Sequence, residues 1–365
     1  MPTGPVRKAG PAPFPVRRAG QTKVIDVNDH DALVCLEPGR LRLERHPVPA
    51  AGPGEVLVRP RRVGICGTDY HIYEGKHPFL RYPRVMGHEL AVEAVEAPPG
   101  SGIRAGEIFA VNPYLSCGRC IACRRGKPNC CVDVSVLGVH RDGGMSGLLA
   151  VPAANLLRAP GLSLDQCALV EFLAIGAHAV RRGAVTGDDR VLVVGAGPIG
   201  LGAALFARLS GASVAVLDRD AGRAAAAEAV AGVTGLAMDG AGPDALAAFT
   251  GREGFDVVLD ATGSPGAMEA GFDHVAHGGR YVLVSVVKGS IAFSDPDFHR
   301  KELTLLGSRN ATADDFERVI AAIRDGAVPS GRLITHRTDL RGAVADIPRW
   351  ASEKAGLIKA VIDVD

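Results

Sequence analysis

The sequence predicts an α/β protein that consists of a β-rich N-terminal unit followed by a doubly wound parallel sheet. Three observations predict it. Up to about residue 160, short alternating runs are interrupted by glycine and proline; at Val191 the pattern changes to alternating strands and helices; and a glycine-rich turn stands at that change. A length of 365 residues suits two domains, and a hydrophobic content of 47% is ordinary for a globular chain with a sizeable core.

Charge and cysteine usage narrow the classes of partner. The net charge is +1, from 41 basic and 40 acidic residues, so nothing favours binding to nucleic acid or to an anionic membrane. No apolar run is long enough for a membrane span. Eight cysteines without a visible secretory signal predict a cytoplasmic protein, because the reducing cytosol keeps thiols free to bind metal.

The first 22 residues differ from the rest of the chain. They are rich in proline and in arginine or lysine, and they contain no acidic residue. Such a segment buries too little apolar surface to fold alone. The sequence therefore predicts a disordered basic extension over residues 1–22.

The β-rich unit is predicted from period-two patterns. EVLVRPRRVGIC and LAVEAVEA each alternate apolar and other residues, which is typical of strands with one buried face. QCALVEFLAIGAHAVRRG then predicts a largely buried helix and a connector into the second unit.

The second unit reads as six short buried strands separated by helical stretches. The predicted strands are VLVVG, VAVLD, GLAMD, VVLDATG, YVLVSV and LTLLGS. This alternation indicates a parallel sheet covered on both faces, and six strands fit a complete dinucleotide-binding sheet. ADDFERVIAAIRDG predicts a capped amphipathic helix, and LIKAVIDV predicts a last strand that rejoins the first domain.

A nucleotide site is predicted where the first of these strands ends. Gly195, Gly197 and Gly200 form G-x-G-x-x-G, with Pro198 and Ile199 between the last two. These glycines permit the tight turn, the close approach of a pyrophosphate and the packing of helix on strand, and the helix N-terminus favours phosphate. A carboxylate follows at Asp218, where it can bind ribose hydroxyls and repel a 2′-phosphate, so NAD is favoured over NADP; the neighbouring Arg219 weakens that preference.

Four cysteines predict a structural zinc site. Cys117, Cys120 and Cys123 are each separated by two residues, and seven residues separate the third from Cys131. Four thiolates aimed at one point match tetrahedral zinc. An iron–sulfur cluster, disulfides and unconnected buried thiols remain open as alternatives, and Cys130 competes with Cys131 as the fourth ligand.

A second metal site is predicted upstream. Cys66 follows a strand in GICGTDYH, and His88 and Glu89 stand together in VMGHEL. One thiolate and one imidazole are good zinc ligands. In a regular strand His88 and Glu89 would point to opposite faces, so both ligate only where the backbone is irregular.

Together, GICGTD, GHE, the four-cysteine loop and GAGPIG, in this order, resemble the zinc-dependent medium-chain dehydrogenase/reductase (alcohol dehydrogenase) superfamily, from about residue 24 to the end. VEFLAIGAHAVRRG and DFHRKELTLLGSRNAT resemble its sorbitol- and L-galactonate-5-dehydrogenase-like branch. The resemblance implies a GroES-like catalytic domain over residues 23–180 with a structural zinc lobe at about 112–132, a Rossmann NAD-binding domain over 181–315, and a C-terminal segment, 316–365, that returns to the catalytic domain.

The resemblance also implies roles for single residues. Cys66, His88 and Glu171 match the catalytic zinc ligands, and Glu89 matches a carboxylate that sits beside this metal and can coordinate it. Thr68 matches the hydroxyl that accepts the substrate proton, and His71 the imidazole that relays it to solvent. Cys117, Cys120, Cys123 and Cys131 match the structural zinc lobe, which makes two zinc ions per chain. The candidate substrate contacts are Tyr70, His140, His299, Arg300 and Arg309.

The predicted function is zinc- and NAD-dependent oxidation of a secondary hydroxyl of a polyol, sugar or sugar acid. A simple alcohol or a β-hydroxy amino acid such as threonine would use the same metal and cofactor. A non-catalytic nucleotide-binding sensor module is the alternative of another class, and the retained Cys66, His88 and Glu171 argue against it. The resemblance implies a homodimer or homotetramer.

Overall fold

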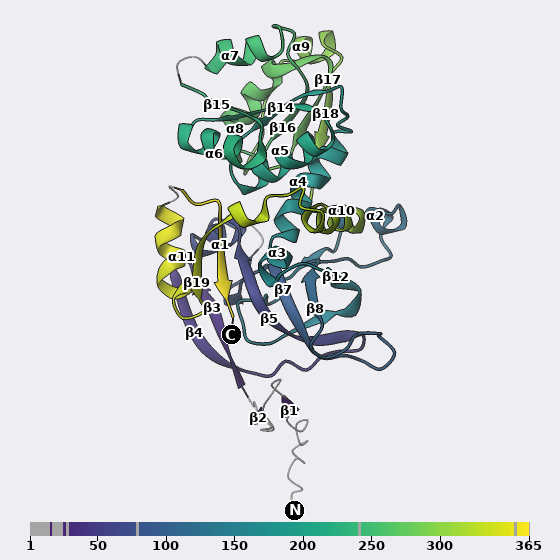
Figure 1. Ribbon diagram of the computed structural model, residues 1–365, viewed down its shortest axis with the longest axis vertical. Coiled ribbons are helices and arrows are strands. Elements are labelled where there is room, and N and C mark those ends of the chain that lie inside the picture. Colours follow the sequence, from purple (N-terminus) through teal and green to yellow (C-terminus); the bar gives the residue numbers. More distant parts are fainter. Residues whose placement is uncertain are drawn as a thin grey trace, which may run out of the picture.

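The computed structural model describes residues 15–16, 25–26, 29–77, 80–239, 242–353 and 356–364. Figure 1 shows a β-rich lower body and an upper body formed around a parallel sheet. Helix α4 (Val170–Arg182) lies between them, and α10 (Ala313–Arg324) packs against it. The predicted α/β class, with a β-rich unit followed by a doubly wound sheet, is confirmed.

The lower body contains a seven-stranded sheet in the order β12-β8-β7-β5-β20-β19, with β11 also paired to β5. Its predicted strands appear as β5 (Glu55–Ile65) and β7 (Glu89–Glu96). Strand β20 (Lys359–Asp363) pairs antiparallel with β5, so the end of the chain returns to this sheet. The other strands of the sheet are β8 (Ile108–Val111), β11 (Leu149–Pro152), β12 (Leu156–Arg158) and β19 (Ile334–Asp339).

Smaller sheets complete the lower body. Three strands, β3, β4 and β6, form one of them, and two-residue strands form the others. Their bounds are β1 (Pro15–Val16), β2 (Ile25–Asp26), β3 (Asp29–Glu37), β4 (Arg40–Pro47), β6 (Arg84–Val85), β9 (Tyr114–Leu115) and β10 (Ser135–Val136). Apart from β1, the predicted disordered extension lies outside the described residues.

The upper body is a six-stranded, entirely parallel sheet in the order β15-β14-β13-β16-β17-β18. This is the 3-2-1-4-5-6 order of a dinucleotide-binding sheet, in which ligands bind beyond the carboxyl ends of the strands. All six strands come from the six predicted segments. Their bounds are β13 (Arg190–Val194), β14 (Ser213–Asp218), β15 (Thr234–Ala237), β16 (Phe255–Asp260), β17 (Val275–Leu283) and β18 (Thr304–Gly307).

The helices begin and end at sequence signals. In α5 (Pro198–Leu209) the N-cap is Gly197 and Pro198 occupies the first turn, where its missing N–H costs nothing. A capping box of Thr312 and Asp315 opens α10. The remaining helices are α1 (Gly67–Tyr73), α2 (Ile121–Arg124), α3 (Leu164–Ala168), α6 (Ala221–Ala231), α7 (Gly242–Phe249), α8 (Pro265–Ala270), α9 (Asp295–Arg300) and α11 (Ala343–Ser352), with single 3-10 turns at Pro128–Cys130, Ala153–Asn155, Gly271–His274 and Ser330–Arg332. Among the described residues, no helix combines the length and the hydropathy that crossing a membrane requires.

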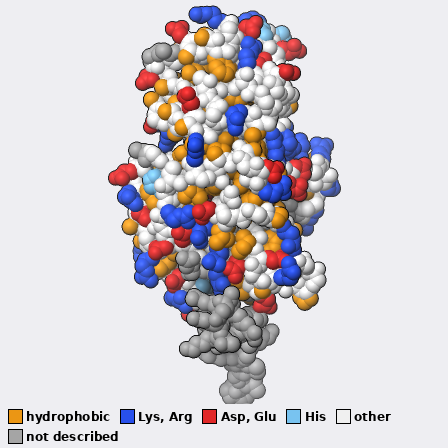
Figure 2. All heavy atoms as spheres, viewed as in Figure 1, with side chains coloured by type: hydrophobic (Ala, Val, Ile, Leu, Met, Phe, Trp, Pro, Cys, Tyr) orange, Lys and Arg blue, Asp and Glu red, His pale blue; other side chains and the backbone are white. Residues whose placement is uncertain are grey.

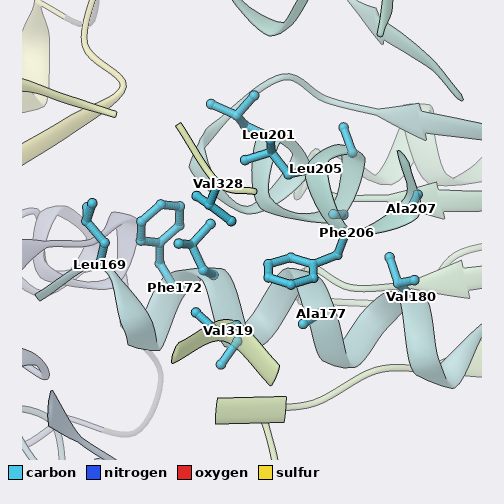
Figure 3. Close-up of a cluster of buried hydrophobic side chains, with 14 of the residues drawn as sticks. Leu169, Phe172, Ala177, Val180, Leu201, Leu205, Phe206, Ala207, Val319 and Val328 are labelled. Carbon is cyan, nitrogen blue, oxygen red and sulfur yellow. The ribbon is translucent and has the colours of Figure 1, made fainter. Parts of the chain in front are cut away.

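Buried side chains of α4 pack against helices on either side of it. Figure 3 shows Phe172 and Ala177 of α4 among side chains of α5, such as Phe206, and of α10, such as Val319. A Cβ at Gly176 would lie 2.4 Å from the backbone of Gly202, so the two helices touch at glycine. Helix α4 also contacts β7 and β8, so it packs against both bodies.

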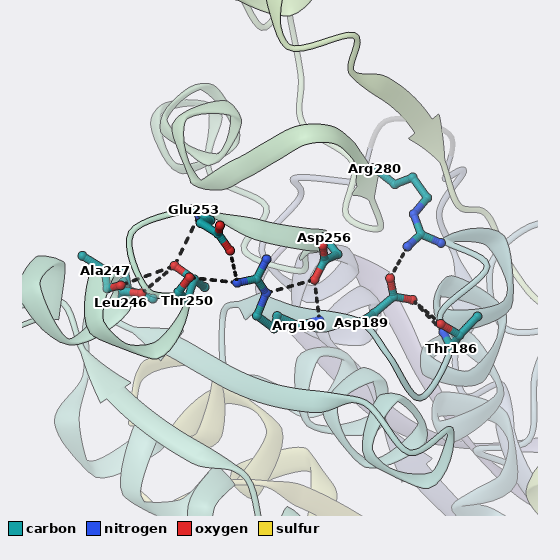
Figure 4. Close-up of polar contacts among 10 residues, drawn as sticks. Thr186, Asp189, Arg190, Leu246, Ala247, Thr250, Glu253, Asp256 and Arg280 are labelled. Carbon is teal, nitrogen blue, oxygen red and sulfur yellow. Dashed lines mark hydrogen bonds and ion pairs between the residues drawn. The ribbon is translucent and has the colours of Figure 1, made fainter.

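Ion pairs hold the upper sheet at the amino end of its strands. Arg190 donates to Asp256 at 3.2 Å and to Glu253 at 2.9 Å, and Arg280 pairs with Asp189 (Figure 4). Most of these residues stand at or before the starts of β13 and β16, at the edge opposite the nucleotide crevice. They fix the sheet and leave its carboxyl edge for ligand binding.

The visible surface carries charges of both signs. Figure 2 shows basic and acidic side chains interspersed over the visible face, with apolar side chains scattered among them. This mixture agrees with the net charge of +1.

Candidate active site

The four-cysteine lobe brings its thiols to one point. The ligand atoms of Cys117, Cys120, Cys123 and Cys131 all lie within 4.8 Å of one another. Backbone N–H groups face the sulfurs; Cys117 N lies 3.3 Å from Cys131 Sγ, and Cys123 N lies 3.5 Å from Cys120 Sγ. The hydrogen bond from the N–H of Cys123 is the main cause that lowers the pKa of Cys120 to about 6. Four thiols so arranged, with N–H groups that stabilise thiolate, fit a closed zinc site.

A second group forms at the end of β5. Ligand atoms of Cys66, His88 and Glu89 lie within 4.8 Å of one another. Cys66 is the N-cap of α1, and its N–H donates to the carboxylate of Asp69 at 2.8 Å. His88 follows Gly87, whose φ of +94° breaks the extended backbone before β7. That irregularity is what lets adjacent His88 and Glu89 face one site.

The surroundings of this group fit a metal ion. His88 Nδ1 and Glu89 Oε2 are buried and make no hydrogen bond within the described part of the chain. A buried polar atom without a partner costs about 1–3 kcal/mol, so a ligand is expected there. Burial opposes protonation of His88, yet its contact with Cys66 and the charge of Asp69 hold its pKa well above the usual range. Thiolate, imidazole and carboxylate together are zinc donors.

Two buried carboxylates flank the pair of Cys66 and His88, and each has a different partner. Glu89, fully buried, accepts a hydrogen bond at 2.7 Å from Lys359, which is itself 1% exposed. Glu171, in the first turn of α4, accepts a short hydrogen bond from the Tyr114 hydroxyl. Burial raises the pKa of Glu171, while the charge of His88 lowers it. The carboxylate of Glu171 is not one of the ligand atoms grouped within 4.8 Å.

The nucleotide turn is shaped as the glycine spacing predicts. Gly195 has a φ of +96°, and a Cβ at Gly200 would lie 1.8 Å from the carbonyl oxygen of Gly195. A Cβ at Gly197 would meet nothing within 4 Å, so the backbone there is open to a ligand at the N-terminus of α5. Asp218, at the carboxyl end of β14, accepts from the N–H of Ala196 at 2.7 Å and so braces the turn.

Comparisons with known proteins identify the family. The profile described as alcohol dehydrogenase GroES-like domain matches residues 52–161, and that described as zinc-binding dehydrogenase matches residues 198–325. The chain is 42% identical over 339 residues to L-galactonate-5-dehydrogenase of Escherichia coli K12, covering 91% of this chain and 98% of that protein. This chain belongs to the zinc-binding dehydrogenase family.

Solved structures agree with this family. A short chain alcohol dehydrogenase from Escherichia coli CFT073, complexed with NADH, has a TM-score of 0.87 at 30% identity and covers 92% of this chain and 100% of its own. A putative zinc-binding dehydrogenase from Sinorhizobium meliloti 1021, bound to NADP, has a TM-score of 0.83 at 28% identity and covers 92% and 99%. This dehydrogenase is therefore an oxidoreductase that acts on CH–OH groups.

In this dehydrogenase the predicted proton-transfer residues lie beside the Cys66 group. Thr68 Oγ1 is 3.9 Å from Cys66 Sγ. His71, three residues further along α1, is exposed to solvent. Between them Tyr70 is 7% exposed, and burial is the main cause that raises its pKa. One turn of helix thus spans the distance from the buried ligand group to solvent.

The candidate substrate contacts divide into two groups. Arg309 acts electrostatically on His140: burial lowers the pKa of His140 most, and the positive charges of Arg309 and Arg84 lower it further. The structure does not bring His299 and Arg300 there. Their helix, α9, ends beside the first half of β17, where the N–H of Gly278 donates to the carbonyl oxygen of Lys301 at 2.6 Å. The amino ends of the strands lie here, at the edge of the sheet opposite the nucleotide crevice.

Sequence reasoning missed several residues of this site. Lys359 and Tyr114 are separated from the carboxylates that they bind by 270 and 57 residues, so no local spacing marks them. His77 was also missed: burial lowers its pKa most, and the charges of His140, His71, His88 and Lys288 add to that effect. A lysine directly before the apolar run AVI of this strand was the one signal available for Lys359.

Proposed function

We propose that this dehydrogenase oxidises a secondary hydroxyl of a sugar acid or a related polyol, with NAD as hydride acceptor and zinc held by Cys66, His88 and Glu171. The observation that carries the proposal is the buried group at the end of β5, where Cys66 and His88 meet and His88 Nδ1 and Glu89 Oε2 have no hydrogen-bond partner within the described residues. The relative that is 42% identical is named L-galactonate-5-dehydrogenase, and its substrate class supports the choice.

The charges support Glu171 as the third ligand and Glu89 as an additional one. The negative charge of Glu89 is already balanced by Lys359 at 2.7 Å. Glu171, 4% exposed, has only the neutral Tyr114 hydroxyl as hydrogen-bond donor among the described residues. A buried carboxylate whose hydrogen-bond donor is neutral is costly, so a metal ion would stabilise Glu171 more than Glu89, which already pairs with Lys359.

The residues of α1 supply a path for the proton. When bound, zinc would act as a Lewis acid that lowers the pKa of the substrate hydroxyl. Thr68 would accept that proton, because a hydroxyl both accepts and donates, and the exposed imidazole of His71 would pass it to solvent. The substrate carbon gives its hydrogen, with two electrons, to the nicotinamide of NAD, so the alcohol becomes a carbonyl compound and one proton is released.

Asp218 favours NAD. It is 7% exposed and ends β14 at the point where an adenosine ribose binds in such sheets. A carboxylate there repels a 2′-phosphate, whereas the exposed Arg219 next to it would attract one. The relatives of known structure include one complexed with NADH and one bound to NADP, so the preference has to be measured.

Cationic side chains favour a substrate with a carboxylate. In the catalytic domain, His77 comes within electrostatic range of Lys288, and His140 within range of Arg309. Lys288 and Arg309 both follow strands of the Rossmann sheet. Arginine binds carboxylates by two parallel hydrogen bonds. We therefore expect a sugar acid to bind better than the neutral polyol of the same carbon skeleton.

We also propose a cytoplasmic homodimer or homotetramer with two zinc ions per chain. All eight cysteines are unpaired, which supports a reducing compartment. The two groups of ligand atoms support two metal ions. Metal analysis and light scattering measure the zinc content and the assembly directly.

The test is NAD reduction with four substrates: L-galactonate, galactitol, L-threonine and ethanol. We expect L-galactonate to give the highest kcat/KM, loss of activity after chelation, and recovery with Zn²⁺. Arg309→Ala should raise KM for L-galactonate by about tenfold or more while leaving galactitol unchanged, because one charge-assisted hydrogen bond is worth about 1.5–3 kcal/mol. Arg141→Ala, at an exposed arginine 3.8 Å from Glu55, is the control. Full activity of the chelated protein, or of Cys66→Ser, would refute the proposal.

A further inference from the structure

Asn129, inside the four-cysteine lobe, connects that lobe to the Rossmann domain. It lies in the 3-10 turn Pro128–Cys130, two residues before Cys131, and is 4% exposed. Its Nδ2 donates to the carbonyl oxygen of Arg309 at 2.9 Å, and Asn310 Nδ2 donates back to the carbonyl oxygen of Asn129 at 3.1 Å. Two hydrogen bonds between residues about 180 positions apart thus join the lobe to the segment that follows β18.

The hydrogen bonds fix the orientation of this amide. The carbonyl of Arg309 only accepts, so Asn129 must present its NH₂ group there. The second N–H then points at His178 Nε2, 3.2 Å away, which must accept. His178 therefore carries its proton on Nδ1 and donates to Asp315 at 2.8 Å, a tautomer assigned from this pattern.

The far end of this chain of hydrogen bonds is firmly held. Asp315 is 1% exposed and accepts from both Nε and Nη2 of Arg181, at 2.7 and 2.8 Å. It also accepts from the N–H and the hydroxyl of Thr312 as part of the capping box of α10. His178 itself is 3% exposed. Asn129 is therefore anchored on α4 and α10 as well as on the segment after β18.

The segment that Asn129 holds carries Arg309. Asn310 has a φ of +52°, a left-handed conformation that asparagine tolerates, and the turn there sets the direction in which the chain leaves β18. Arg309, the residue before it, is exposed, and its positive charge helps to lower the pKa of His140 after the larger effect of burial. The two hydrogen bonds of Asn129 thus hold the backbone that carries the Arg309 side chain.

We propose that the four-cysteine lobe positions Arg309 for substrate binding through Asn129, so that an intact lobe sets substrate affinity. Asn129 is a positioning residue, and the inference rests on the proposed function of Arg309 as a contact for the substrate carboxylate. The lobe then differs from a passive scaffold: loss of its metal weakens substrate binding without any change at Cys66 or His88.

A double-mutant cycle tests the coupling. Asn129→Asp keeps the volume but places an acceptor against the Arg309 carbonyl, so we expect KM for L-galactonate to rise about fivefold or more, with kcat and the Kd for NAD changed less than about twofold. Arg309→Ala should raise KM at least as much, and the double variant should match Arg309→Ala alone. Additive effects would overturn the inference.

Asn155→Asp is the matched control. Asn155 Nδ2 also donates to two backbone carbonyls, those of Asn112 at 2.7 Å and Tyr114 at 3.4 Å, but both lie within the catalytic domain. We expect Asn155→Asp to give effects on KM that are additive with Arg309→Ala. An equal non-additivity in this control would mean general destabilisation and would contradict the positioning role.

Two further measurements separate this inference from the proposed function. Hydrogen exchange at residues 308–312 should rise about tenfold in Asn129→Asp and in Cys131→Ser, with α5 unchanged, because these amides lose their anchor. Calorimetry should show weaker binding of L-galactonate in the same two variants. If the wild type binds L-galactonate without turning it over, only the proposed function fails. If exchange or binding is unmoved in Asn129→Asp, this inference fails alone.

Discussion

The two groups of candidate metal ligands, at Cys117–Cys131 and around Cys66 and His88, are constructed in opposite ways. In the lobe, four identical donors come from one stretch of 15 residues, Cys117–Cys131, three of them are partly exposed, and backbone N–H groups face the sulfurs. Around Cys66 and His88 the donors are mixed and the carboxylates are buried. Their partners come from distant parts of the chain, such as Lys359 on the last strand.

The difference follows from what each site has to do. A closed site needs four thiolates at the right spacing, because zinc offsets two of their four negative charges and the facing backbone N–H groups stabilise the sulfurs further. An open site keeps room for a substrate, so the fold must hold donors apart and balance buried charge by other means. Lys359 balances the charge of Glu89 here, whereas Tyr114 gives Glu171 a hydrogen bond but no charge.

Removing Lys359 should cause the largest loss of stability. Lys359→Met fills similar volume but leaves Glu89, fully buried, without its counter-charge. Breaking one partner of a buried pair costs about 3–5 kcal/mol, so we expect the free energy of unfolding to fall by that amount in denaturant titrations.

A second substitution separates charge from packing in this prediction. Lys359→Met together with Glu89→Gln removes both charges, so it should recover most of the lost stability in the same titrations. Lys359 also lies 4.5 Å from the ring centroid of Phe172, which both variants alter equally. A double variant as unstable as Lys359→Met would show that packing, and not the buried charge, accounts for the loss.

The comparison also separates what the sequence predicts from what it does not. The lobe follows from the spacing of Cys117, Cys120, Cys123 and Cys131, and the nucleotide turn follows from its glycines, because in both the chemistry lies within one local segment. All six strands of the Rossmann sheet follow from short apolar runs. Local pattern suffices wherever neighbours in sequence are neighbours in space.

Local sequence patterns could not predict contacts between residues from distant segments. The ion pair of Glu89 with Lys359 exists only because β20 pairs with β5, which brings the chain end beside Ile65. Helix α1, which carries Thr68 and His71, was also not predicted, since seven residues give too little periodicity. His299 is predicted on the substrate side, whereas the topology puts α9 at the opposite edge of the sheet.

Asp315→Asn should have an intermediate effect that depends on pH. Hydrogen bonds from Arg181 and His178 overcome the effect of burial and hold the pKa of Asp315 below its usual value. A depressed pKa stabilises the fold above the unfolded value of about 4 and loses that contribution as pH falls further. We expect Asp315→Asn to cost about 1.5–3 kcal/mol at pH 7 and progressively less below pH 4.

Chemical denaturation of both proteins across about pH 2.5–7 measures this difference. Asp325→Asn is the control, since Asp325 is exposed and pairs only with Arg324 among the described residues, so its substitution should change stability little at any pH. A cost for Asp315→Asn that stays constant down to about pH 2.5 would contradict the assigned role of its negative charge.

The smallest effect on global stability is expected in the lobe, where Cys131→Ser and Cys130→Ser make a matched pair. Cys131 is buried in the group of four sulfurs, whereas its neighbour Cys130 is exposed. Cys131→Ser should release one of two zinc ions and reduce the free energy of unfolding by only about 1 kcal/mol, a few degrees in Tm, because a partly exposed loop unfolds locally. Cys130→Ser should keep both ions.

Because the Cys66 group has its own donors and its own charge balance, the zinc that remains in Cys131→Ser should stay until Cys66 is also replaced. Loss of both ions from Cys131→Ser, measured by metal analysis, would mean that the two sites are not independent.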